Sequence, residues 1–67
     1  MLVIVMYDIS DSTIRTSLIK KLRFFGLIRI QKSIFSGILN IEERLDLVSE
    51  FDSYISSAKD SIIITWM

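Results

Sequence analysis

The residue in this chain with the clearest capacity for chemistry is Asp8, at the end of the first apolar run. Residues 1–7 are apolar and rich in β-branched side chains, so they predict a buried strand. A carboxylate where a buried strand meets a loop is costly unless a cation, hydrogen bonds or a partner stabilises it. Asp8 is therefore either a functional acid or metal ligand, or an aspartate that accepts hydrogen bonds from Ser10, Ser12 or loop amides. The residues alone favour the second role.

The composition narrows the chemistry that such a site can perform. The chain has no histidine and no cysteine, which excludes thiolate–metal sites, disulfides and the usual general base near neutral pH. Catalysis would have to use carboxylates, tyrosine, serine, lysine, arginine or metal-bound water. Ligand sets made only of oxygen favour Mg²⁺, with Mn²⁺ as the other candidate, over zinc.

Charge is unevenly distributed along a chain whose formal net charge is zero. Residues 1–40 carry six basic and two acidic side chains (+4), and residues 41–67 carry two basic and six acidic ones (−4). This asymmetry indicates either a basic face for an anionic partner or two amphipathic helices with differently charged solvated faces. The six basic residues of the first half are Arg15, Lys20, Lys21, Arg23, Arg29 and Lys32.

Hydrophobic periodicity and capping residues divide the chain into strands and helices. In chain order the pattern predicts a strand at 2–7, a helix that starts after Ser10 or Asp11 and ends at Gly26, and a strand at 27–35. A turn or bulge at Ser36–Gly37 then leads into a short strand at 38–39. A helix after Asn40, a polar loop at 56–60 and a strand at 61–67 complete the chain. The first helix is expected to bury Ile14, Leu18, Ile19, Leu22 and Phe25, and the second to bury Ile41, Leu45, Val48, Phe51 (or Leu47), Tyr54 and Ile55.

The element order β-α-β-β-α-β predicts a ferredoxin-like α+β fold: an antiparallel four-stranded sheet with both helices on one face. The length of 67 residues has room for one domain, residues 1–67. The first and last strands are apolar on both faces, whereas the helices can cover only one. The sequence therefore predicts a homodimer in which two sheets face each other. The aromatic and glycine signature of RNA-recognition modules is absent.

Nothing at the N-terminus has the pattern of a signal peptide, because the apolar run is short, has no basic segment and meets a charge at once. The run is also far below the roughly 20 residues of a membrane helix. The expected location is the cytoplasm, with no membrane partner.

Several segments in order resemble the small CRISPR-associated protein Cas2 family. They are Tyr7–Asp11, Arg15, Phe25–Leu27, Arg29–Gly37 and Asp60–Ile64. No single segment is specific, but their order and spacing on a chain of this size are, and the similarity runs from the first strand to the last.

The resemblance implies a homodimer of ferredoxin-like protomers with the first-strand aspartates near the dimer axis. It implies a Mg²⁺-dependent endonuclease for single-stranded RNA or double-stranded DNA, acting in spacer acquisition with the Cas1 integrase. Family members also act as non-catalytic bridges between integrase dimers. By matching position, Asp8 would be the metal ligand, and Tyr7, Arg15, Arg29 and Phe35 would surround the site.

Each of these residues has a second interpretation. Arg15 and Arg29 are phosphate contacts or transition-state clamps, or else solvated surface charges. Phe35 stacks on a base or, the favoured alternative, packs in the dimer interface. Tyr7 has the opposite parity to Asp8, which places it in the core beneath the helices.

Three functions follow from the residues and the resemblance. The first is a metal-dependent nuclease in which two copies of Asp8 share one ion. The second is a structural adaptor that binds duplex DNA through its basic face. The third is a ribonuclease toxin of similar fold.

Overall fold

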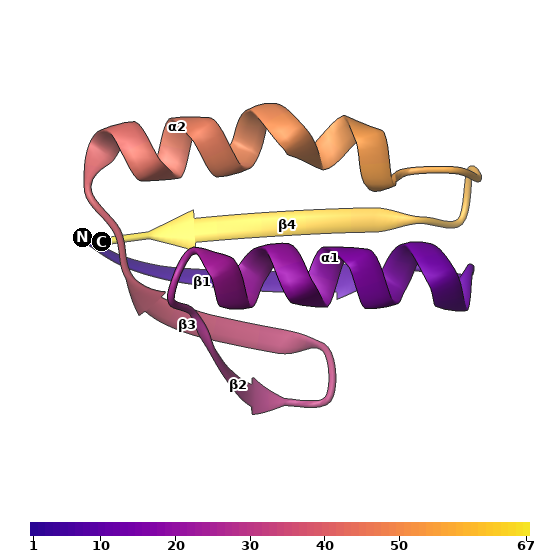
Figure 1. Cartoon of the computed structure of the whole chain (residues 1–67), viewed down its shortest axis with the longest axis horizontal. Coiled ribbons are helices and arrows are strands. Elements are labelled where there is room, and N and C mark those ends of the chain that lie inside the picture. Colours follow the sequence, from indigo (N-terminus) through magenta and orange to yellow (C-terminus); the bar gives the residue numbers. More distant parts are fainter.

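Strands and helices follow one another in the predicted order (Figure 1). The computed structural model of the chain describes all 67 residues. Its elements are β1 (Leu2–Asp8), α1 (Ser12–Phe24), β2 (Ile28–Gln31), β3 (Ile34–Ile38), α2 (Ile41–Glu50), the short 3₁₀ helix η1 (Phe51–Tyr54) and β4 (Ser61–Trp66). The α+β class and the ferredoxin-like order are confirmed. Neither helix reaches the length and apolar character that crossing a membrane requires.

The four strands form one antiparallel sheet in the order β2-β3-β1-β4, with β1 in the interior. Val5 of β1 pairs with Phe35 on one side and with Ile64 on the other. The last pair of the β1–β4 ladder joins Asp8 to Ser61. The end of the first strand therefore lies beside the start of the last, although they are far apart in the sequence.

Both helices cover the same face of the sheet, as predicted. Alternation along β1 turns Val3, Val5 and Tyr7 towards the helices, where all three are buried. They pack in one apolar core against Leu18 and Leu22 of α1. The rest of this buried core consists of Ile9, Leu27, Phe35, Leu39, Leu47 and Phe51.

The other face of the sheet is apolar and no element of the chain covers it. We call it the open sheet face and define it by Ile4, Met6, Ile28, Ile34, Ile38 and Ile63, which the strand registers place on one side. Met6, in the interior strand, is 37% exposed, and Ile38 is 72% exposed. Apolar patches of this kind usually mark an interaction surface. The second copy of the chain that would cover this face remains a prediction.

Local capping signals predicted the helix ends well. The Asp11 carboxylate accepts a hydrogen bond from the Ile14 N–H (2.9 Å) and caps α1. Asn40 and Glu43 form a reciprocal capping box at the start of α2. Gly26 follows α1 with φ = 85°, a conformation that glycine adopts without steric cost.

The strand expected at 27–35 is wrong. The structure ends β2 at Gln31, turns at Lys32 and Ser33, and runs β3 through the expected turn at Ser36–Gly37 into the expected short strand at 38–39. The apolar alternation continues through this turn, and Ser33 is its only turn-favouring residue, so the sequence gives only a weak signal for it. Gly37 serves close packing instead, since a Cβ there would lie 2.7 Å from Leu27 Cδ2.

The buried face expected for α2 is also wrong in part. Leu47 and Phe51 are buried, whereas Ile41, Leu45 and Val48 are exposed. The helix carries two apolar stripes, and tertiary contacts select between them. Arg44 stacks on the ring of Trp66 in β4, 4.0 Å from its centroid, and Glu50 pairs with Lys21 of α1 at 3.1 Å. In the orientation in which α2 makes these contacts, it is rotated about its axis relative to the orientation that the sequence predicted.

Candidate functional site

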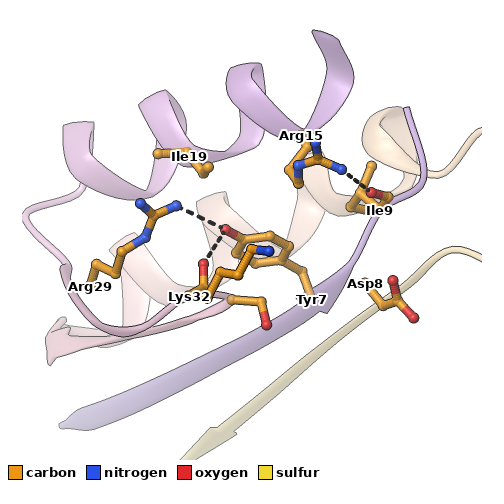
Figure 2. Close-up of a pocket in the computed structure, with 8 residues that line it drawn as sticks. Tyr7, Asp8, Ile9, Arg15, Ile19, Arg29 and Lys32 are labelled. Atoms are coloured by element: carbon orange, nitrogen blue, oxygen red, sulfur yellow. Dashed lines mark hydrogen bonds between the residues drawn. The ribbon is translucent and has the colours of Figure 1, made fainter. Parts of the chain in front are cut away.

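A groove forms where the end of β1, the first half of α1 and the β2–β3 turn come together (Figure 2). It has a volume of about 500 Å³ and is lined by Tyr7, Asp8, Ile9, Arg15, Ile19, Arg29, Lys32 and Ser33. We call it the basic groove. A second hollow, lined by Met1, Asn40, Ile41 and Glu42, has one carboxylate and no basic side chain. The basic groove is therefore the place where the chain concentrates charged groups of use to an anionic ligand.

Tyr7 forms the floor of the basic groove and links the strands around it. The residue is only 6% exposed, in agreement with the predicted core position, but its hydroxyl reaches the groove. That hydroxyl donates to the Lys32 carbonyl at 3.2 Å and accepts from Arg29 Nη2 at 3.4 Å. The Tyr7 backbone N–H also donates to the Ser33 carbonyl at 3.1 Å. The β2–β3 turn is thereby held against the end of β1.

Both arginines that the sequence singled out, Arg15 and Arg29, line this groove, and neither forms an ion pair. Arg15 Nη1 donates to the Ile9 carbonyl at 2.9 Å, and Arg29 lies 5.4 Å from the centroid of the Phe35 ring. The one salt bridge of the chain is Lys21–Glu50, on the helices. Lys32, which sequence reasoning did not single out, adds a third cation to the lining. Cations without acidic partners attract an anionic ligand such as a phosphodiester.

Asp8 lies at the edge of the groove, but its carboxylate points away from the Tyr7 hydroxyl and the arginines (Figure 2). It belongs to the same side of the sheet as Met6, and it is exposed. It accepts no hydrogen bond, so the expected bonds from Ser10 and Ser12 are absent: Ser10 donates to Asp60 and Ser12 makes no such contact. The Asp8 oxygens are free for a cation.

One chain does not by itself contain a complete metal site. No group of three or more acidic side chains gathers anywhere in the structure. Mg²⁺ keeps several waters and accepts one or two protein carboxylates, so the donor chemistry of Asp8 suits it, but one carboxylate cannot fix the ion. A metal at Asp8 therefore requires ligands from a second molecule, either another copy of the chain or the substrate.

Phe35 lies elsewhere than either sequence interpretation placed it. It is fully buried on the helix side of the sheet, with its ring centroid 6.3 Å from that of Tyr7. Its face is not available to a base in this arrangement, and it is not part of the open sheet face. It supports the groove from beneath, where Arg23 and Arg29 approach its ring at 5.7 and 5.4 Å.

Sequence reasoning missed Asp60, which organises the loops beside the site. Its Oδ1 accepts from the N–H and Oγ of Ser10, both at 2.9 Å. Its Oδ2 accepts from the N–H (2.9 Å) and Oγ (3.1 Å) of Ser56 and from the N–H of Ser57 (3.2 Å). The sequence did contain a signal for this position. Asp60 directly precedes β4, and when β4 pairs antiparallel with β1, the start of β4 lies beside the end of β1.

Hydrogen bonds from the backbones of Ser10 and Ser56 hold the pKa of the Asp60 carboxyl well below its ordinary value. Since the folded-state pKa is lower than the unfolded one, the ionised group stabilises the fold above the unfolded pKa of about 4. That stabilisation is lost as the pH falls below this value. We expect Asp60→Asn to melt at a lower temperature than wild type at neutral pH and to lose less stability on acidification. Melting curves between neutral and acidic pH test this, with Asp52→Asn as the control that keeps the wild-type slope.

Comparisons with known proteins agree over the whole chain. A family model described as CRISPR associated protein Cas2 matches residues 1–67. CRISPR-associated endoribonuclease Cas2 1 of Archaeoglobus fulgidus is 42% identical over 64 residues, which are 96% of this chain and 68% of that protein. CRISPR-associated endoribonuclease Cas2 3 of Chloroflexus aurantiacus is 39% identical over 62 residues, which are 92% and 66% of the two chains. The chain thus spans about two thirds of the length of these relatives.

A solved structure agrees with the sequence matches. The crystal structure named cas2 superposes with a TM-score of 0.85 at 28% identity, covering 97% of this chain and 71% of that one. The sheet order, the free carboxylate at the end of β1 and the basic groove beside it therefore occur in a chain that belongs, over its full length, to the CRISPR-associated protein Cas2 family.

Proposed function

We propose that this chain is a metal-dependent endonuclease of CRISPR spacer acquisition that binds RNA or duplex DNA along the basic groove and cleaves a phosphodiester bond next to Asp8. The observation that carries the proposal is the pairing of three cations without acidic partners with an exposed, unbonded carboxylate at the rim of the same groove. The curated relatives are named endoribonucleases, which supports RNA as a substrate. The Cas1 integrase is the proposed partner, on the basis of the family resemblance.

Nucleic-acid binding would depend on the guanidinium groups of Arg15 and Arg29. Guanidinium groups form paired, charge-assisted hydrogen bonds with phosphate oxygens. The Tyr7 hydroxyl accepts from Arg29, and the Ile9 carbonyl accepts from Arg15, so part of each side chain is held before ligand arrives. Less side-chain freedom is then lost on binding. In cleavage, the same cations would stabilise the charge that develops on the phosphate.

The metal would be held by Asp8 together with ligands from a second copy. The open sheet face is apolar, and Asp8 lies on the same side of the sheet. A homodimer formed through this face would bring a second Asp8 to the interface, and oxygen ligands suit Mg²⁺ or Mn²⁺. A bound divalent ion would lower the pKa of its water and so supply a nucleophile to a chain without histidine.

A structural adaptor for duplex DNA is the second candidate, and one observation favours it. The Asp8 carboxylate points away from the cations of the basic groove. Duplex binding by Arg15, Arg29 and Lys32 then needs neither Asp8 nor a metal. Salt-sensitive binding that survives Asp8→Asn, with no cleavage, would support this function over the first.

Replacement of the groove arginines tests the binding site that both functions share. Arg15→Ala and Arg29→Ala should each reduce the slope of log K against log salt by about 1, because each removes one phosphate contact. Lys59→Ala is the matched control, since Lys59 is an exposed cation outside the groove with no acidic partner. Binding titrations across a salt series give the slopes. Unchanged slopes in both arginine variants would show that Arg15 and Arg29 do not contact phosphate.

A further inference from the structure

A single peptide group beside the basic groove is held from both ends. It joins Ile9 to Ser10, directly after Asp8. Its C=O accepts from Arg15 Nη1 at 2.9 Å (Figure 2), and its N–H donates to Asp60 Oδ1 at 2.9 Å. The carboxylate thus faces the positive end of the peptide dipole and the guanidinium faces the negative end. Each charged group polarises the peptide in the direction that strengthens the other hydrogen bond.

Asp60 is firmly anchored at its other oxygen. Its Oδ2 accepts three hydrogen bonds from Ser56 and Ser57, and its own N–H donates to the Ser57 carbonyl at 3.1 Å. The residue that follows it, Ser61, pairs with Asp8 in the sheet. The loop before β4 is therefore a fixed support for the loop after β1.

We propose that Asp60 is a positioning residue for the nucleic-acid site, which fixes the Ile9–Ser10 peptide and through it the Arg15 guanidinium. Asp60 does not itself line the basic groove. The inference rests on the proposed function in one respect, namely that Arg15 contacts phosphate. It adds a residue from the acidic half of the chain to a site otherwise built from the basic half.

The direction in which Asp60→Asn changes nucleic-acid affinity distinguishes a positioning role from a general electrostatic effect of the charge. Removing a negative charge near a polyanion should strengthen binding through the general field of the protein. If Asp60 positions Arg15, Asp60→Asn should instead weaken binding, because the amide can no longer accept bonds at both oxygens. A support role for the fold alone would lower the melting temperature without changing affinity in the folded protein.

The experiment is a double-mutant cycle of nucleic-acid affinity with Asp60→Asn and Arg15→Ala, measured by fluorescence anisotropy on labelled single-stranded RNA and on duplex DNA. Asp60→Asn should weaken binding about fivefold to tenfold, the equivalent of losing roughly one ordinary hydrogen bond. In the Arg15→Ala background the same change should have little effect. The control Asp52→Asn removes an exposed carboxylate that makes no side-chain hydrogen bond, and it should bind as tightly as wild type or more tightly.

Melting curves fix an assay temperature at which every variant is folded. If Asp60→Asn is unfolded there, Ser10→Ala takes its place in the cycle, since it removes only the Oγ bond to Asp60 and should give a smaller loss with the same dependence on Arg15. Unchanged affinity in Asp60→Asn, or an equal loss with and without Arg15, would overturn the inference and leave the proposed function intact.

Absence of nucleic-acid binding by wild type would instead refute the proposed function. The positioning of Arg15 can then still be decided by NMR of the arginine side chains, which needs no ligand. A guanidinium held at the Ile9 carbonyl should give a slowly rotating, slowly exchanging Arg15 signal in wild type and in Asp52→Asn. That signal should be lost in Asp60→Asn, and its persistence there would overturn the inference.

Discussion

Asp8→Asn is expected to reduce Mg²⁺-dependent cleavage about a thousandfold, a loss of the size seen when a group that stabilises transition-state charge is removed. The fold should survive, because the Asp8 carboxylate is exposed and accepts no hydrogen bond that the structure depends on. If two such carboxylates approach each other in a dimer, the change should even stabilise the metal-free protein. Initial cleavage rates and melting temperatures of the two proteins test both expectations.

Mg²⁺ should also stabilise wild type more than Asp8→Asn. A ligand that binds only the folded state stabilises it by about 2.7 kcal/mol at a concentration of 100 Kd. The matched control is Asp46→Asn, which removes an exposed carboxylate on α2 that forms no side-chain hydrogen bond or ion pair. Equal thermal shifts in wild type and in Asp8→Asn would show that Asp8 does not bind the metal.

Met6→Glu is expected to convert a dimer into monomers and to abolish cleavage with it. Met6 lies on the interior strand of the open sheet face, so a second copy there would bury the new carboxylate. Burial of an unpaired charge costs several kcal/mol, and about 3 kcal/mol already weakens association roughly a hundredfold. Sedimentation or light scattering across a range of protein concentrations measures the change.

Phe24→Glu is the control for this substitution. Phe24 is on α1 and highly exposed, so the same chemical change there avoids the open sheet face. A wild-type protein that is monomeric at micromolar concentration would contradict the dimer. A Met6→Glu protein that remains a dimer would show that the two copies meet through another surface.

The parts of the fold that could be predicted are those decided by nearby residues. Asp11, Gly26 and Asn40 act within a few residues of the helix ends they define, so their types and positions are sufficient. The burial of Val3 and Val5 on one side of β1 follows from strand alternation in the same way.

The predictions that were wrong concern the orientation of α2 and the turn between β2 and β3. In both places, residues distant in the sequence decide between conformations that the local sequence permits equally. The rotation of α2 is accompanied by a stack between Arg44 and Trp66, residues that periodicity cannot pair. The turn at Lys32 and Ser33 is held by Tyr7, which comes from another strand. A pattern read along the chain contains neither contact.

Only part of the candidate site could be predicted from the sequence. The composition and the strand end singled out Asp8, but the gathering of Tyr7, Arg15 and Arg29 rested on a family resemblance, since these residues come from three different elements. Asp60 could have been found from antiparallel pairing alone, because its place before β4 puts it beside the end of β1. It accepts the hydrogen bonds of Ser10 that the sequence assigned to Asp8.

The most direct test of nuclease function is one assay on wild type, with labelled single-stranded RNA and duplex DNA of the same sequence incubated with Mg²⁺ or with a chelator. We expect cleavage of at least one substrate with Mg²⁺ and none with the chelator. Binding of duplex DNA by wild type, with no cleavage of either substrate at any Mg²⁺ concentration, would contradict the nuclease and support the adaptor in its place.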